Sequence, residues 1–283
     1  MTVAVGFFDG VHLGHQAILK GADAALTFEN HPLSLLAPER APRLIMSGAE
    51  KAQTIRDLGV FVTAIDFDAD VAGWSPERFL EMLKGYAATW SEHLKIPAAP
   101  LRIRCGANWR FGKGGVGDAT WLRAHGVDVA VVPYAAFDGA PVSSTRIRQA
   151  LEAGEIAAAN AMLGRPHVVF GTHVAGKGLG RALGYPTLNV VPVATGLRLP
   201  HGVYTVELDG CRAVANYGLA PTLGDRAWKD PVWELHMLSD CPPVSPNVRF
   251  SLLRFIRPER AFASLDELKA QITADCQEAL CRG

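Results

Sequence analysis

Two histidines stand three residues apart in a glycine-rich turn near the start of the chain. The sequence GFFDGVHLGH, which begins at Gly6, directly follows an apolar run and leads into residues that favour a helix. Its glycines let the backbone approach a phosphate closely, and the free amides of a helix start attract anions. His12 and His15 could then donate hydrogen bonds to charge that develops on an attacked phosphate. The turn therefore indicates phosphate chemistry without a covalent nucleophile, and the alternative is a plain turn with two solvated histidines.

A second group of polar residues marks another expected helix start, far downstream. The sequence SSTRIR places Ser143, Ser144 and Thr145 before Arg146 and Arg148. Capping amides and guanidinium groups together can bind the β- and γ-phosphates of a nucleotide. The alternative is an ordinary N-cap with a basic first turn.

A third segment, GKGLGRALGYPTLN at residues 176–189, packs glycines, cations and oxygen donors into fourteen positions. A flexible loop of this kind can wrap phosphates with backbone amides and cations, although it is not a Walker A loop. Thr187 and Asn189 offer oxygens of the type that Mg²⁺ accepts beside nucleotide phosphates. The alternative is a surface turn before a strand that begins at Pro186.

The first two motifs, taken together, resemble the adenylyltransferase module of bacterial bifunctional riboflavin kinase/FAD synthetases, within the nucleotidyltransferase superfamily. The segments FENHP from Phe28, GANWRFG from Gly106 and Gly117-Asp118 are also similar to that module. The resemblance implies in-line attack of the FMN phosphate on the α-phosphate of ATP, with Mg²⁺ present and pyrophosphate leaving. It gives His12 and His15 the catalytic role. The phosphate-binding residues expected on this basis are Gly6, Phe8, Asp9, Gly10, Gly14, Ser143, Ser144, Thr145 and Arg148, and the flavin-binding residues are His31, Asn108 and Arg110.

The third motif resembles the riboflavin kinase signature of the same family. The resemblance implies that Thr187 and Asn189 bind the metal and the nucleotide, and that the glycine-rich loop binds the ATP phosphates. The loop residues expected to do so are Gly176, Lys177, Gly178, Gly180 and Arg181. In the family, an acidic residue within an E-x-H pattern takes the proton of the riboflavin hydroxyl, and WELH matches this pattern at Glu234. The alternative for Glu234 is an ordinary strand carboxylate.

The elements expected around these motifs divide the chain into two modules. Before the boundary, apolar runs at residues 3–8, 25–28, 62–67, 101–105 and 127–133 alternate with helical patterns, which is typical of a parallel sheet with crossover helices. After it, residues 167–174, 202–208, 211–217, 232–238 and 248–256 are strand-like, and Asp209-Gly210 predicts a hairpin turn. We therefore predict an α/β nucleotidyltransferase (Rossmann-like) domain at residues 1–165 and a small antiparallel barrel with a terminal helix at residues 166–283.

Local signals place several helices. Ser47 with Glu50 forms a capping box, Ser75-Pro76 starts another helix, and residues 144–163 favour helix with a break at Gly154. Ser264 with Glu267 opens a terminal helix that should pack on the barrel through its apolar residues Leu265, Leu268, Ile272 and Cys276. Nine residues separate His15 from the next apolar run, so the first helix must be short.

Composition narrows the classes of protein. The chain of 283 residues has 28 basic and 28 acidic residues and no basic stripe, which argues against a nucleic acid partner. No apolar run reaches the length of a membrane span, and no signal peptide is evident, so a cytoplasmic location is expected. The five cysteines lack metal-ligand spacing and are expected to be reduced.

The interpretation that follows is a bifunctional enzyme that uses ATP and Mg²⁺ at two sites, with riboflavin, FMN and ATP as small-molecule partners and no prediction of oligomeric state. Three alternatives remain open at this point. They are a riboflavin kinase whose adenylyltransferase module is impaired by the short first helix, a flavin-nucleotide-binding protein without turnover, and an adenylyltransferase for another small molecule.

Overall fold

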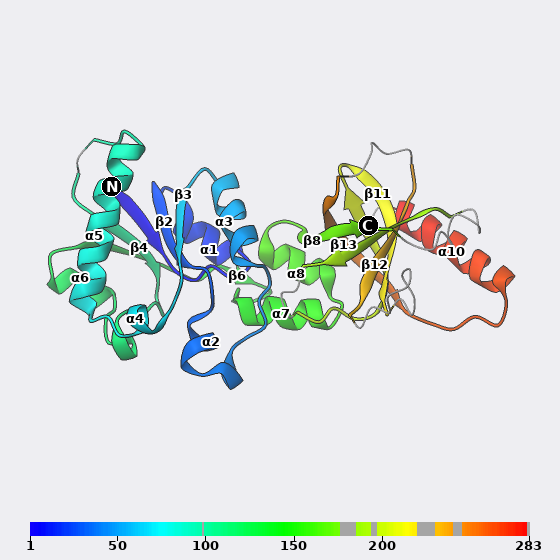
Figure 1. The fold of residues 1–283 in the computed structure, drawn as a ribbon, viewed down its shortest axis with the longest axis horizontal. Helices are drawn as coiled ribbons and strands as arrows, with labels where there is room; N and C mark the ends of the chain where they lie inside the picture. The colour runs from blue at the N-terminus through cyan, green and yellow to red at the C-terminus, as the bar shows by residue number, and fades with distance from the viewer. Residues whose placement is uncertain (98, 176–184, 194–196, 220–229, 240–244, 282–283) are drawn as a thin grey trace. The chain divides into compact units, whose positions relative to one another are not determined.

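The computed structural model describes residues 1–97, 99–175, 185–193, 197–219, 230–239 and 245–281. They form two compact units, residues 1–144 and 145–283. The order of the elements along the chain can be followed by colour in Figure 1.

The first unit is built on a parallel five-stranded sheet, as predicted. Its strands are β1 (Thr2–Val5), β2 (Ala24–Phe28), β3 (Phe61–Ile65), β4 (Arg102–Gly106) and β5 (Asp128–Val132), in the order β3-β2-β1-β4-β5. The first strand lies in the centre, so the turn that follows it opens at the edge where all five strands end. This is where ligands bind in open α/β sheets.

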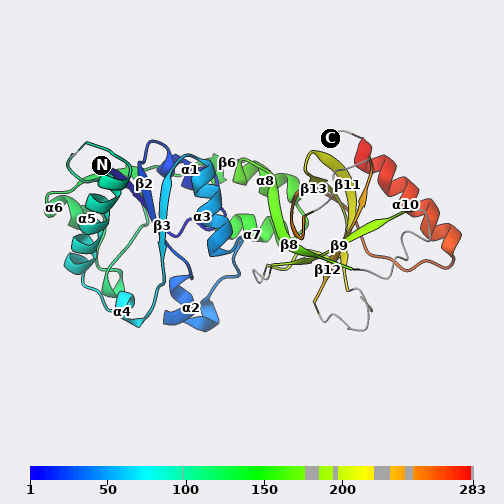
Figure 2. The same cartoon turned by 45° about the horizontal axis from the view of Figure 1, so that its top comes forward.

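Helices cover both faces of this sheet (Figures 1 and 2). Val3 and Val5 of β1 face a core shared with α5 (Pro76–His93) and α6 (Ala119–Ala124), whereas Ala4 faces a core shared with α1 (Leu13–Leu19) and α3 (Gly48–Asp57). Burial on both faces explains why the strands are continuous apolar runs in the sequence. The first helix has seven residues, which confirms that it is short.

The remaining elements of the first unit are small. They are α2 (Pro32–Leu36), the 3₁₀ turns Pro38–Arg40 and Lys113–Gly115, α4 (Ala69–Ala72), and a hairpin of β6 (Ala136–Phe137) and β7 (Ala140–Pro141). Sequence reasoning did not predict them, because segments this short carry little periodicity.

The second unit is a closed six-stranded barrel in the order β10-β11-β12-β9-β8-β13. Its strands are β8 (His167–Val174), β9 (Thr187–Pro192), β10 (Gly202–Leu208), β11 (Cys211–Gly218), β12 (Val232–Met237) and β13 (Asn247–Pro258), and each pairs antiparallel with its neighbours. Tyr204, Trp233 and Phe250 fill the interior. Asp209 and Gly210 both have positive φ, as the predicted hairpin turn requires.

In the described part of the second unit, three helices accompany the barrel strands. α7 (Ser144–Glu152) and α8 (Ile156–Leu163) are separated at Gly154, whose φ is 78°, and α8 ends at a left-handed Gly164. The terminal helix α10 (Leu265–Leu280) packs against β10 and β11, which confirms that prediction. Leu268, Ile272 and Cys276 are half-buried, whereas the expectation for Leu265 was wrong, since this side chain is 63% exposed. The fully buried positions of α10 are Asp275 and Ala279.

The cysteine expectation needs one correction. Cys105, Cys276 and Cys281 are free thiols, but Cys211 is disulfide-bonded. The prediction of reduced cysteines was therefore wrong for Cys211, because the spacing of cysteines along the sequence does not show which of them lie within bonding distance in the fold.

Candidate functional site

The turn after β1 has an unusual backbone. Phe8, Gly10 and Val11 have φ values of 57°, 83° and 42°, and the amide of Val11 donates to the carbonyl oxygen of Phe8 at 3.0 Å. Left-handed φ is strained for Phe and Val, so the surrounding structure must hold this conformation. Such strain is found most often at ligand-binding sites.

His12 caps the helix that this turn opens. Its Nδ1 accepts a hydrogen bond from the backbone amide of His15 at 3.3 Å, and its side chain is buried. A neutral imidazole that accepts at Nδ1 carries its proton on Nε2. The cap therefore orients His12 to donate from Nε2.

His15 stacks on His12, with 3.5 Å between the ring centroids. Burial lowers the pKa of His15 well below its ordinary value, and His12 and Lys51 lower it further. The ring is therefore neutral at pH 7. Its Nδ1 is buried and has no hydrogen-bond partner among the described residues.

Asp9 holds the turn in place through two hydrogen bonds. Its side chain is 4% exposed, and Oδ1 accepts a hydrogen bond from the amide of Ile45 at 2.9 Å. Its carbonyl oxygen accepts a bond from the hydroxyl of Ser144, also at 2.9 Å. The structure thus brings together Asp9 of the first motif and Ser144 of the second, two residues far apart in the sequence.

The rest of the second motif lies at the start of α7. Arg148 donates to the hydroxyl of Thr145 at 3.1 Å, so the two side chains share one turn of the helix. Ser143 precedes them and is half-buried. Thr145 and Arg148 belong to the second unit.

A cavity of about 460 Å³ opens beside the histidine turn. Its walls are mostly apolar and come from the ends of β1 and β2, from the segments that follow β3 and β4, and from α5. Seven of the lining residues are aromatic: Phe7, Phe28, Phe67, Trp74, Phe79, Trp109 and Phe111. Arg110 and Lys113 add two cations. The size and the aromatic lining suit a flat organic ring, as in most small-molecule sites.

The three predicted flavin-binding residues stand differently toward this cavity. Arg110 lines it. His31 caps α2 by accepting from the amide of Leu33 at 3.1 Å, and its ring meets the edge of Phe7, which lines the cavity. Asn108 is exposed in the turn after β4 and is not among the wall residues.

A second set of predicted residues lies on three adjacent barrel strands. Asn189 of β9 pairs with Glu234 of β12, which also pairs with Asn216 of β11. Thr187 pairs with His236, two residues further along the same strands. Because side chains alternate along a strand, Thr187 and Asn189 share one face with Glu234 and His236. The barrel therefore brings the three predicted kinase residues of the described part of the chain together.

Glu234 has the environment of a base. Its side chain is half-buried, and burial raises its pKa, with a further rise from the charge of Glu259. Glu259 accepts a hydrogen bond from the Asn216 amide at 3.2 Å and lies 3.8 Å from His201. A Cβ at position 218 would overlap the Glu259 carboxylate, so Gly218 gives this carboxylate the room for its present position.

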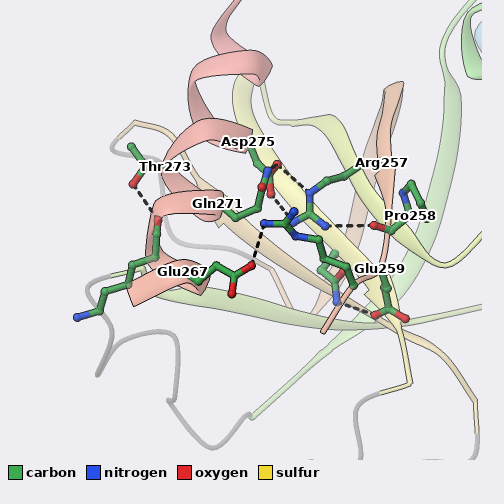
Figure 3. A network of polar contacts seen from close by, with 10 residues as sticks. Arg257, Pro258, Glu259, Glu267, Gln271, Thr273 and Asp275 are labelled. Carbon is green, nitrogen blue, oxygen red and sulfur yellow. Dashed lines mark hydrogen bonds and ion pairs between the residues drawn. The ribbon is translucent and has the colours of Figure 1, made fainter. Parts of the chain in front are cut away.

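Helix α10 is anchored beside this group (Figure 3). Arg257 makes two hydrogen bonds to the buried Asp275, from Nε at 3.0 Å and from Nη2 at 2.6 Å, and Gln271 donates to the same carboxylate. Arg257 also donates to the carbonyl oxygen of Pro258, which precedes Glu259. The strand end that carries Glu259 is therefore bonded to the terminal helix.

Five of the predicted phosphate-binding residues, Gly176, Lys177, Gly178, Gly180 and Arg181, lie outside the described residues.

Sequence reasoning gave no role to Lys51, which is 2% exposed beneath the histidine turn. The sequence did contain a signal for its burial. Lys51 precedes Ile55 by four residues, so the two side chains lie on the same, buried face of α3. Groups of three or more His, Cys, Asp or Glu side chains that could hold a metal are absent from the described part of the chain.

Comparison with known proteins gives a consistent result. A family model described as FAD synthetase matches residues 1–146, and a riboflavin kinase (flavokinase) model matches residues 163–281. A bifunctional riboflavin kinase/FMN adenylyltransferase of Escherichia coli K12 is 33% identical and covers 97% of this chain and 90% of its own length. Proteins of the same description from Pseudomonas fluorescens and Bacillus subtilis are 34% and 30% identical, and each alignment covers at least 98% of this chain and 91% of the relative.

Among solved structures, a crystal structure described as a macrolide-efflux protein from Streptococcus pneumoniae superposes with a TM-score of 0.81. It is 27% identical, and the match covers 100% of this chain and 94% of that chain. Among the described residues, the helices are too short or too polar to span a membrane.

Proposed function

The chain belongs to the family of bifunctional riboflavin kinase/FMN adenylyltransferases, and from this premise we propose which residues carry each of its two reactions. Both family domains are present, and the curated relatives align over nearly the whole chain. The protein therefore phosphorylates riboflavin to FMN and adenylylates FMN to FAD, with ATP as the second substrate of each reaction.

In the kinase reaction, we assign the base to Glu234. Its carboxylate takes the proton of the terminal ribityl hydroxyl of riboflavin while that oxygen attacks the γ-phosphate of ATP, and ADP leaves. The observation that supports this role is the register that places Glu234 between Asn189 and Asn216. A raised pKa makes the carboxylate a better proton acceptor than an exposed glutamate.

The donor set around Glu234 fits Mg²⁺. Thr187 supplies a hydroxyl and Asn189 a carbonyl oxygen from the same face of β9, and Mg²⁺ usually takes one or two protein oxygens and completes its shell with water and substrate phosphates. When bound, the ion neutralises the charge of the ATP phosphates. Asn189 is 6% exposed, so its amide is held in place by the barrel and can orient a ligand.

In the adenylylation reaction, the FMN phosphate oxygen attacks the α-phosphate of ATP, and the bond to the β-phosphate breaks to release pyrophosphate. We assign the stabilisation of the developing charge to His12 and His15, with His12 donating from Nε2. No proton has to leave a nucleophile, since the FMN phosphate is already an anion. The aromatic cavity beside the turn is proposed to hold the flavin ring, with Arg110 at its wall.

The alternatives raised by the sequence are not favoured. The short α1 retains both histidines, and the FAD synthetase model matches the whole first unit, which argues against an impaired module. The relation to a structure described as a macrolide-efflux protein does not outweigh the agreement of two family models and the curated relatives. A boundary between residues 165 and 166 and a cytoplasmic location remain our predictions.

A flavin product assay tests the assignment. Purified protein is incubated with riboflavin, ATP and Mg²⁺, and riboflavin, FMN and FAD are separated. Glu234→Gln should abolish formation of FMN but still form FAD from supplied FMN, and His15→Ala should do the reverse. Loss of both reactions in either variant would contradict the assignment of one reaction to each unit.

A further inference from the structure

A buried lysine lies beneath the histidine turn of the first unit. Lys51, on α3, is 2% exposed, and its ammonium donates a hydrogen bond to the carbonyl oxygen of Phe28. The same ammonium lies 3.8 Å from the centroid of the Phe7 ring, in a cation–π contact. Phe7 follows β1, Phe28 ends β2, and both line the aromatic cavity. Lys51 therefore contacts two residues that line the cavity from different strand ends.

The charges that face this ammonium come from three other segments. Asp9 lies in the turn after β1, Glu29 follows β2, and His15 lies on α1. The neighbouring Glu50 is engaged elsewhere, since its carboxylate accepts from the amide of Ser47. Lys51 is thus the cation between two carboxylates that belong to neighbouring loops of the candidate site.

Burial of this charge is unfavourable for the fold. Lysine is rarely fully buried, because the ammonium loses its hydration. Here burial lowers the pKa of Lys51 to about 8, although Asp9 and Glu29 raise it. An apolar residue at this position would serve the packing of α3 equally well, so the charge needs a reason other than stability.

We propose that Lys51 is a positioning residue for adenylyl transfer, and that its ammonium holds the Phe7-to-Asp9 part of the turn and thereby sets His12 and His15 relative to the flavin cavity. Lys51 acts through the turn and touches no reacting atom. The inference rests on the proposed assignment of this reaction to His12 and His15.

The first test compares Lys51→Met with Lys84→Met, an exposed lysine on α5 of the same unit. Methionine has an unbranched side chain only one atom shorter than that of lysine, and it carries no charge. The kcat for FAD formation should fall about 10- to 100-fold in Lys51→Met, the cost of a small misplacement of reacting groups. KM for FMN and ATP should change far less, and the kinase reaction of the same chain should be unchanged. A thermal midpoint that falls together with kcat would indicate a merely structural role.

The second test is a pH profile. In the unmodified protein, kcat for FAD formation should decline as pH rises through about 8, because Lys51 loses its proton there. Free carboxylates and imidazoles titrate below this range. Lys51→Arg keeps its charge throughout, so the alkaline decline should be absent. This variant tests the inference even where Lys51→Met does not fold, and an unchanged alkaline decline in Lys51→Arg would overturn it.

The histidine variants distinguish an error in the proposed adenylylation site from an error in the inference about Lys51. If His12→Ala and His15→Ala form FAD normally, the proposed site is wrong and the inference about Lys51 is wrong with it. If they lose FAD formation while Lys51→Met matches Lys84→Met, only the inference about Lys51 is overturned.

Discussion

At the residue scale, the proposed kinase site contains two carboxylates whose surroundings differ. Glu234 is half-buried on β12, whereas the side chain of Glu259 is 41% exposed at the end of β13. The charge of Glu259 contributes to the raised pKa of Glu234. The more buried group can therefore serve as base while the more exposed one tunes it, a common division of roles between paired carboxylates.

This arrangement predicts a shift in the pH profile of FMN formation. A base works only when deprotonated, so activity is lost as pH falls through the pKa of Glu234. Glu259→Gln removes the neighbouring negative charge, which should lower that pKa and move the acidic limb of kcat to lower pH. Asp266→Asn, an exposed carboxylate on α10, should leave the limb in place. An unmoved limb in Glu259→Gln would show that Glu259 does not act on the base.

The individual residues differ in how well the sequence predicted them. The histidines of the turn are recognisable because glycine spacing and chemistry lie within ten residues. Lys51 is not, because its role depends on the ends of two strands meeting at one edge of the sheet. Asn216 lies in the strand predicted at residues 211–217, but only the β11–β12 register shows that it lies beside Glu234.

At the element scale, the terminal helix depends on a buried ion pair. The side chain of Asp275 is 3% exposed and that of Arg257 is 20% exposed, and they share two hydrogen bonds (Figure 3). Asp275→Ala should lower the free energy of unfolding by about 3 kcal/mol, because it leaves a partly buried guanidinium without its partner. Asp266→Ala, at an exposed position of the same helix, should have little effect. Urea unfolding with an unchanged m-value measures both, and equal midpoints would contradict the anchoring role.

The same helix shows where local patterns stop being informative. Its start was predicted from Ser264 and Glu267, and Ser264 does accept from the amide of Glu267, although the Glu267 carboxylate bonds to Ala263 instead of closing the capping box. The box at Ser47 and Glu50 is complete. On the buried face of α10, Leu268, Ile272 and Cys276 were predicted but Asp275 was not, because a buried aspartate looks like a solvent-facing one until its arginine partner on a strand is known.

At the scale of the whole molecule, both units could be predicted from the sequence because each has its own hydrophobic pattern. Continuous apolar runs signal a sheet buried on both faces, and short strands with hairpin turns signal a barrel. The strand that carries Thr187 and Asn189 was harder to predict, since the same residues also belong to a phosphate-loop motif. Barrel closure then places β9 beside β12 and brings Thr187 and Asn189 next to Glu234, the proposed base.

Both units also bury a neutral histidine, His15 in the first and His167 in the second. Burial, together with the charge of Arg165, lowers the pKa of His167 to about 4. The unfolded chain binds a proton near pH 6.5 and the folded barrel does not, so stability is retained above pH 6.5 and lost as pH falls toward 4. The full loss from His167 is roughly 3 kcal/mol, from a shift of about 2.5 pH units.

His167→Gln cannot be protonated and should flatten the acidic limb of the unfolding free energy, measured by urea titration from pH 7 to pH 4. His173→Gln, at an exposed position of the same strand, should keep the limb, and the same limb in both variants would show that His167 is not responsible.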